Sequence, residues 1–165
     1  MTDPALQDPR YVPPTYRAAD FERPSVTVDV VLFSHGPATA GWQVLLIQRK
    51  RWPYQDFWAI PGGFVEMDET LEAAALRELH EETGLTALPL EQLHTFGDPG
   101  RDPRTRVISV VYVGMLDAGQ VPAVQGMDDA AAARWWPLTS LPPLAFDHDA
   151  VLTLAQRWLA TRQSK

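Results

Sequence analysis

The chain contains no cysteine among its 165 residues, which excludes disulfide bonds, zinc–thiolate sites and a thiol nucleophile. Long apolar runs are also lacking: residues 107–116 are interrupted by serine, tyrosine and glycine and are too short to cross a bilayer. The N-terminus, Met1-Thr-Asp-Pro, has neither the basic start nor the apolar segment of a signal peptide. We therefore expect a cytoplasmic protein without a membrane partner.

The negative charge is concentrated in one short segment. Residues 66–82 carry seven acids and a single base, Arg77, whereas the other 148 residues carry 14 acids and 13 bases. Only two of the basic residues are lysine, so the chain has no lysine-rich tail. A dense acidic patch repels the backbone of nucleic acids and attracts metal cations. We therefore expect no nucleic-acid partner, and the patch is a candidate metal site.

The order of the predicted elements indicates one α/β domain. Residues 1–24 hold five prolines and predict an extended arm, which leaves residues 25–165 as the folded domain. Strands interleaved with two helices predict a mixed sheet between helices. The strand patterns cover 25–33, 42–48, 90–96, 106–116, a short strand after the glycine-rich turn at 60–63, and one ending at Trp135-Trp136; the helical patterns cover 70–83 and 147–161.

The first predicted helix carries three carboxylates on one face. Glu78, Glu81 and Glu82 stand at positions i, i+3 and i+4. Three like charges within one turn destabilise a helix unless a partner offsets them, and an oxygen-preferring divalent cation, Mg²⁺ or Mn²⁺, does so. The alternative is a solvated acidic face, which explains neither the arginine among the acids nor the glycines at both ends of the segment.

This segment resembles the Nudix box, Gly-x5-Glu-x7-Arg-Glu-U-x-Glu-Glu-x-Gly-U, in which U is an aliphatic residue. The resemblance implies the Nudix fold, an α/β/α sandwich with a mixed β-sheet. It also implies hydrolysis of a nucleoside diphosphate linked to another group, by a water that a bound metal activates. All nine defined positions of the pattern are filled, by Gly63, Glu69, Arg77, Glu78, Leu79, Glu81, Glu82, Gly84 and Leu85.

The resemblance also implies roles for individual residues. Arg77 together with Glu69 would orient the carboxylates of the box. The metal ligands would be Glu78 and Glu82, Glu81 as a further ligand or acid–base group, and the carbonyl oxygen of Gly62.

A general base is expected outside the box, because many Nudix enzymes carry it on a loop before a late strand. Asp128 and Asp129 lie in such a place, shortly before Trp135-Trp136. Each is a candidate for the base or for an extra metal ligand. The alternative is an ordinary turn, in which aspartate is common.

An arginine-rich loop follows the strand predicted over 90–96. Arginine guanidinium groups suit phosphate or a terminal ribose phosphate, and the prolines between them stiffen the loop. The alternative is ion pairing with the neighbouring Asp98 and Asp102. The three arginines are Arg101, Arg104 and Arg106.

Basic and aromatic residues interleave after the second predicted strand. Arg49 and Arg51 suit phosphate, and an aromatic ring nearby could stack on an adenine. Phe57 and Trp58 are expected in the core. The candidates for stacking are therefore Trp52 and Tyr54. The four histidines lack metal-ligand spacing, and we expect no catalytic role for them.

Further motifs along the chain are similar to one Nudix branch, that of ADP-ribose pyrophosphatases and Nudix-related regulators of NAD metabolism. They include Pro61-Gly-Gly-Phe, Gly97-Asp-Pro-Gly-Arg-Asp-Pro-Arg and Phe146-Asp-His-Asp. The similarity implies a Mg²⁺-dependent (or Mn²⁺-dependent) hydrolase that splits ADP-ribose into AMP and ribose 5-phosphate, and a homodimer.

Two alternatives to ADP-ribose hydrolysis remain open at this point. One is another small nucleotide substrate: a sugar nucleotide, a dinucleotide or an oxidised nucleoside triphosphate. The other is a sensor that binds ADP-ribose without cleaving it. The regulators append a DNA-binding domain, for which we expect no room before Lys165, and they can carry damaged boxes, whereas every carboxylate is present here.

Overall fold

The computed structural model describes residues 11–12, 14–36, 41–86, 88–116, 122–126 and 130–163. Seven strands form one mixed sheet in the order β3-β2-β1-β6-β5, with β4 paired to β1 and β7 to β2. β1 and β6 are parallel, and the other pairs are antiparallel. The elements are β1 (Ser25–His35), β2 (Trp42–Arg49), β3 (Trp58–Ala59), β4 (Gly62–Phe64), α1 (Leu71–Thr83), β5 (Glu91–Phe96), β6 (Val107–Met115), β7 (Ala130–Pro137) and α2 (His148–Gln163).

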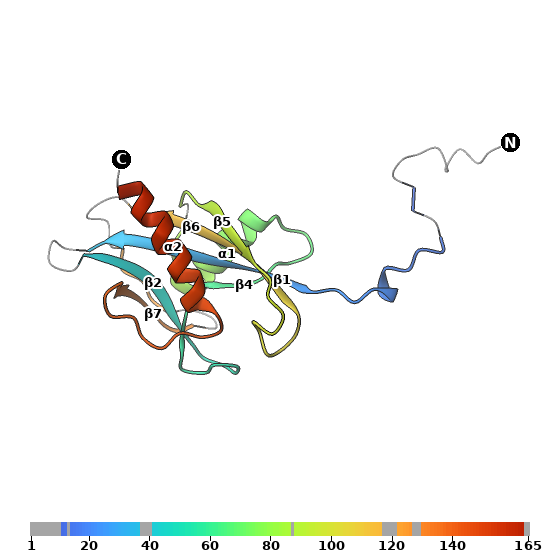
Figure 1. Ribbon diagram of the computed structural model, residues 1–165, viewed down its shortest axis with the longest axis horizontal. Helices are drawn as coiled ribbons and strands as arrows, with labels where there is room; N and C mark the ends of the chain where they lie inside the picture. The colour runs from blue at the N-terminus through green and yellow to red at the C-terminus, as the bar shows by residue number, and fades with distance from the viewer. Residues whose placement is uncertain are drawn as a thin grey trace.

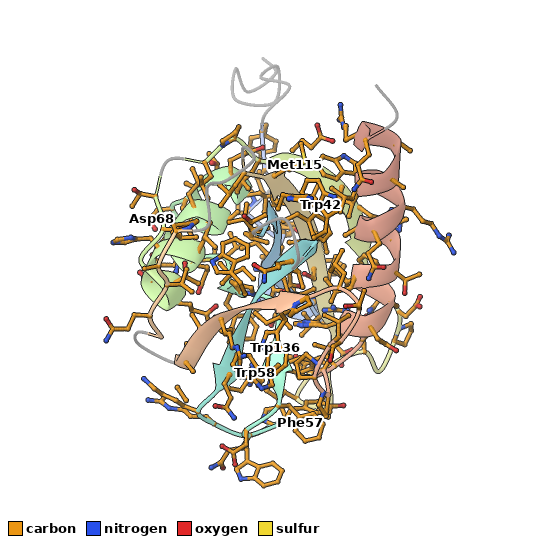
Figure 2. All side chains as sticks on the ribbon, turned by 90° about the vertical axis from the view of Figure 1, so that its left-hand side faces the viewer. Trp42, Phe57, Trp58, Asp68, Met115 and Trp136 are labelled. Carbon is orange, nitrogen blue, oxygen red and sulfur yellow. The ribbon has the colours of Figure 1, made fainter. Side chains whose placement is uncertain are left out.

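The two helices cover opposite faces of this sheet (Figure 1; Figure 2). Val28, Val30 and Leu32 of β1 pack with α1, whereas Val31 and Phe33 pack with α2. Successive side chains of a strand point to opposite faces, so the central strand is buried on both sides and its sequence is almost continuously apolar. The predicted α/β/α sandwich with a mixed sheet is confirmed.

The aromatic segment after β2 differs in part from expectation. Phe57 is 41% exposed and contacts the ring of Tyr54 edge-on, so its predicted place in the core is wrong. Figure 2 shows Phe57 at one end of the molecule, beyond the strand edges. Trp58, on β3, is half-buried against the core and meets the ring of Trp136 at 5.1 Å. β3 is only two residues long, so the sheet does not extend far enough to cover Phe57.

The described part of the N-terminal arm runs away from the sandwich as extended chain (Figure 1). It contains one short 3₁₀ turn, η2 (Ala18–Asp20), and the stacked rings of Tyr16 and Phe21. Neither described helix is long and apolar enough to serve as a membrane span.

The α1 face of the core should tolerate truncation poorly. Leu79 is fully buried against the β1 side chains, so Leu79→Ala removes apolar contacts and leaves a cavity. We expect a loss of about 2–5 kcal/mol in the free energy of unfolding, measured with urea. His80→Ala, one residue further along and exposed, should change it by less than about 0.5 kcal/mol. Equal effects of the two substitutions would contradict this packing.

Candidate active site

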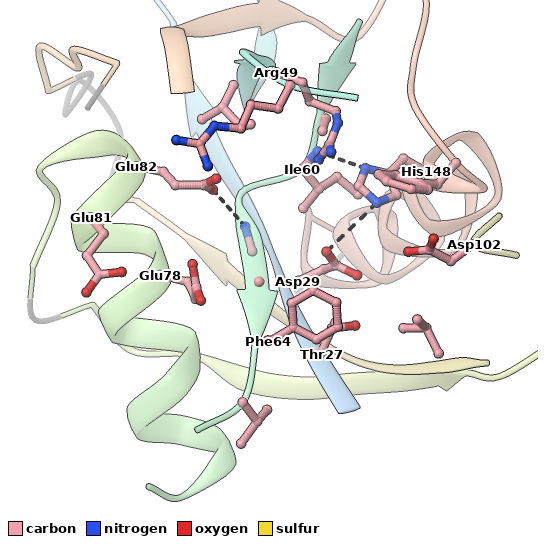
Figure 3. A pocket seen from close by; sticks show the side chains of 18 of the residues that line it. Thr27, Asp29, Arg49, Ile60, Phe64, Glu78, Glu81, Glu82, Asp102 and His148 are labelled. Atoms are coloured by element: carbon pink, nitrogen blue, oxygen red, sulfur yellow. Dashed lines mark hydrogen bonds and ion pairs between the residues drawn. The ribbon is translucent and has the colours of Figure 1, made fainter. Parts of the chain in front are cut away.

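The ends of α1 fix which way its carboxylates point. Thr70 caps the start, its hydroxyl accepting a hydrogen bond from the Ala73 N–H at 3.2 Å. Gly84 ends the helix in the left-handed conformation (φ 77°), and its N–H donates to the His80 carbonyl at 2.8 Å. Between these ends, three of the four glutamates of the box, Glu78, Glu81 and Glu82, line one cavity beside β4 (Figure 3).

Arg77 connects the acidic groups of this face. Its guanidinium donates to both Glu69 oxygens, at 3.0 and 2.6 Å, to Glu78 at 2.8 Å and to Glu81 at 3.1 Å. It also donates to the Phe64 carbonyl at 3.0 Å. The hydrogen bonds from Arg77, with one from the Glu66 N–H, lower the pKa of Glu69 to about 2. The residues expected to orient the box are therefore in contact with each other.

Glu82 and Glu78 are the more buried carboxylates of the face. Glu82 is 8% exposed and accepts a hydrogen bond from the Gly62 N–H at 2.9 Å, and its burial raises its pKa to about 8. Burial also raises the pKa of Glu78. A Cβ at Gly63 would lie 2.3 Å from a Glu78 carboxylate oxygen, so a larger residue there would displace the Glu78 side chain. The glycine-rich turn thus brings β4 against the carboxylates.

The oxygen chemistry of this donor set suits a divalent cation, but its side chains as described do not form a closed ligand shell. Three carboxylates crowd one side of a cavity, and burial penalises the charge of two of them, a penalty that a bound cation would offset. Within the described residues no three acidic or histidine side chains converge on a single ligating point. Arg77 holds Glu78 and Glu81, so these two would have to turn from the guanidinium to bind a cation.

Cationic groups form another part of the cavity wall, and the whole cavity encloses about 720 Å³. Arg101 is 5% exposed at its side chain and binds Asp147 through two hydrogen bonds, at 2.8 and 2.6 Å. Arg104 pairs with Asp102 at 2.7 Å, which is the ion pairing considered as an alternative for this loop. Both arginines still face the cavity. The basic residues of the wall are Arg49, Lys50, Arg51, Arg77, Arg101 and Arg104.

Three residues expected to bind substrate do not line this cavity. Trp52 is 79% exposed, Tyr54 packs its ring on Phe146 at 4.8 Å, and the guanidinium of Arg106 reaches its neighbour's carbonyl at 3.5 Å. The structure thus places these two rings and this cation outside the cavity, and their role in substrate binding stays a prediction. Asp128 and Asp129 lie outside the described residues.

The turn that leads into α2 supplies cavity residues to which the sequence analysis assigned no role. The Phe146 ring lies beneath two guanidiniums, Arg49 at 4.9 Å and Arg104 at 5.6 Å. Phe146 adopts a positive φ of 53°, which is unfavourable for a bulky residue and marks a constrained position. His148 accepts the Ile60 N–H at its Nδ1, 2.9 Å away, and burial lowers its pKa. The motif Phe146-Asp-His-Asp was the only sequence signal for this turn.

Asp29 is a further residue of the cavity for which the sequence analysis gave no role. The signal for it was an acid inside the apolar alternation of β1, at a position 7% exposed. β1 pairs with β4 through residues 27–29 and with β2 through residues 33–35, so Asp29 lies where the strand changes partner. Residues of both strands of the β1–β4 pair, including Thr27, Asp29 and Gly62, line the cavity.

Comparison with known proteins agrees with the site. The NUDIX domain family matches residues 23–155. The chain is 40% identical over 135 residues to the ADP-ribose pyrophosphatase of Methanocaldococcus jannaschii, covering 82% of this chain and 75% of that protein. It is 36% identical over 144 residues to the ADPR responsive transcriptional repressor NtrR of Acinetobacter baylyi, covering 85% of this chain and 56% of the repressor.

Solved structures give the same assignment. The NUDIX domain of Shewanella oneidensis NrtR complexed with ADP ribose has a TM-score of 0.79 at 35% identity, covering 88% of this chain and 94% of that one. A bifunctional NMN adenylyltransferase/ADP ribose pyrophosphatase from Francisella tularensis, complexed with AMP and a Mn ion, has a TM-score of 0.72 at 31% identity, covering 83% and 42%. The chain belongs to the Nudix family. Its class is that of the Nudix pyrophosphohydrolases, related to ADP-ribose pyrophosphatases and NrtR-type regulators, as predicted.

Burial of Glu82 should make the stability of the metal-free protein depend on pH. Its pKa in the folded protein is raised from 4.5 to about 8, so the folded state holds a proton that the unfolded state releases. This stabilising contribution is complete below pH 4.5 and is lost as the pH rises through about 8. We therefore expect Tm to fall less steeply between pH 4.5 and about 8 in Glu82→Gln than in the wild type, with EDTA present to keep both proteins metal-free.

Glu72→Gln is the matched control, because Glu72 is exposed on the same helix. It should leave the pH dependence of Tm unchanged. If Tm of Glu82→Gln fell with pH as steeply as that of the wild type, Glu82 would not be held protonated in the folded protein.

Proposed function

We propose that this chain hydrolyses ADP-ribose to AMP and ribose 5-phosphate with Mg²⁺ or Mn²⁺. The observation that carries the proposal is a single cavity that joins the acidic face of the Nudix box to arginines of two loops. A diphosphate carries negative charge that both the arginines and a carboxylate-bound cation would attract. The similarity to an archaeal ADP-ribose pyrophosphatase supports the choice of substrate.

In this proposal different residues of the cavity bind the cation, exchange protons and position the carboxylates. Glu78, Glu82 and the Gly62 carbonyl would hold the cation, which neutralises the diphosphate and lowers the pKa of the attacking water. Glu81, whose side chain is 42% exposed, is the carboxylate most open to solvent and so suited to exchange protons with water. Arg77 would keep the glutamates in place between turnovers. Asp128 and Asp129 stay candidates for the general base.

The cationic wall would bind the substrate's phosphates. Arg101 and Arg104 are oriented by aspartates, and Arg49 and Arg104 by the Phe146 ring, so little conformational freedom is left for binding to remove. Arg51 lies on the same wall. The proposed partner is thus a small nucleotide, bound by a chain that we propose to be a cytoplasmic homodimer without nucleic-acid or membrane partners.

A second function is favoured by a specific comparison. The relatives include an ADPR responsive transcriptional repressor and an NrtR domain complexed with ADP ribose. A chain of that kind would bind ADP-ribose without rapid turnover. Catalysis therefore has to be separated from binding in the test.

A substrate panel tests the proposal most simply. We expect kcat/KM for ADP-ribose with Mg²⁺ to exceed that for a sugar nucleotide, a diadenosine polyphosphate and 8-oxo-dGTP by about 100-fold, or about 2.7 kcal/mol, with products identified by chromatography. Glu82→Gln should abolish turnover yet retain measurable ADP-ribose binding. Preference for another substrate would refute the assignment to ADP-ribose, and binding without turnover in the wild type would favour the sensor.

A further inference from the structure

Two polar side chains at the floor of the cavity face each other without a direct hydrogen bond. Asp29 of β1 and His148 at the start of α2 have side chains 10% and 5% exposed. Asp29 Oδ1 and His148 Nε2 are 3.8 Å apart, too far for a hydrogen bond. Figure 3 shows the pair across strand β4 from the glutamates of α1, in the same cavity.

The contacts of His148 fix its tautomer. Its Nδ1 lies 2.9 Å from the Ile60 backbone N–H, which can only donate, so Nδ1 must accept. The neutral ring then carries its proton on Nε2, the nitrogen that faces Asp29. The floor therefore presents an N–H donor.

The contacts of Asp29 leave one of its carboxylate oxygens as an acceptor beside that donor. Its Oδ2 accepts a hydrogen bond from the buried hydroxyl of Ser109 and lies 4.0 Å from the Arg101 guanidinium. Its Oδ1 has no hydrogen bond within the described part of the chain, and it is the oxygen nearest to His148. A donor and an acceptor are thus aimed at one space.

We propose that Asp29 and His148 together bind a sugar hydroxyl of the nucleotide substrate. A hydroxyl both donates and accepts, so it can donate to Asp29 Oδ1 while it accepts from His148 Nε2. A phosphate oxygen would be repelled by the carboxylate, and an ammonium group would leave the imidazole N–H without an acceptor. A ligand that lacks this hydroxyl would lose both hydrogen bonds, the one to Asp29 and the one from His148. The pair therefore makes the site prefer the hydroxylated sugar over its deoxy form.

This inference rests on the proposed function for the presence of a sugar diphosphate in the cavity. ADP-ribose offers two sources of the hydroxyl, the adenosine ribose and the terminal ribose. The two products of hydrolysis each contain one of these riboses, so their binding tells the two sources apart. Ribose 5-phosphate is compared with its 1-, 2- and 3-deoxy forms, and AMP is compared with its 2′- and 3′-deoxy forms. Binding is measured by calorimetry on the full chain with Mg²⁺, so no turnover is needed.

In the wild type, one deoxy ligand of one series should bind at least about 10-fold more weakly than its parent, because it leaves a charged acceptor and a buried donor unpaired. Asp29→Asn and His148→Asn should reduce that difference to within about twofold. His148→Asn keeps an acceptor for the Ile60 N–H but places no N–H at the position of Nε2. His148→Gln, which can place an N–H near the Nε2 position, should restore part of the difference.

Asp98→Asn is the matched control, since it removes an exposed carboxylate from a neighbouring loop and should keep the full difference. The inference is overturned if all deoxy ligands bind the wild type like their parents, if neither parent binds, or if the difference survives in both Asp29→Asn and His148→Asn. Failure of ADP-ribose hydrolysis alone, with the hydroxyl preference intact, would count against the proposed function and leave this subsite standing.

Discussion

The charge balance around Arg77 is the constraint on which the site depends. Three glutamates share its guanidinium, and a fourth, Glu82, is buried one turn further along the same helix. Without the guanidinium these carboxylates would repel one another. With it they stay together, and Glu78, Glu81 and Glu82 line one cavity beside the glycine-rich turn. Hydrogen bonds to a charged group are worth about 1.5–3 kcal/mol each, enough to offset the crowding of like charges. The arginine therefore keeps the carboxylates of the candidate cation site close together.

The opposite side of the cavity depends on a different part of the chain. The turn Phe146-Asp147-His148 contacts Arg49, Arg101 and the β3–β4 connection in succession. Three neighbouring residues thus link the end of the chain to groups far away in sequence. Such a turn can set the spacing between the arginines and the acidic face of α1, because it is anchored to both the strands and the second helix. Phe146 and His148 of this turn line the same cavity as Asp29 of β1.

Much of this arrangement could be predicted because its determinants are local. The helix α1, with its capping residue and left-handed glycine, follows from a contiguous pattern, and so do the contacts of Arg77 with residues one to eight positions away. The two-sided burial of β1 follows from its apolar run. The branch of the family followed from motifs on either side of the box.

What failed depends on long-range packing. Phe57 was expected in the core, but a two-residue β3 leaves nothing to cover it. Asp29 and His148 meet only after β1 and α2 are placed on the sheet, 119 positions apart in sequence, and no spacing rule joins them. The most direct test of the account is a crystal structure with Mn²⁺ and the non-hydrolysable α,β-methylene analogue of ADP-ribose. We predict manganese density beside Glu78 and Glu82, with the diphosphate between it and Arg101. Manganese or diphosphate bound away from these residues would contradict the account.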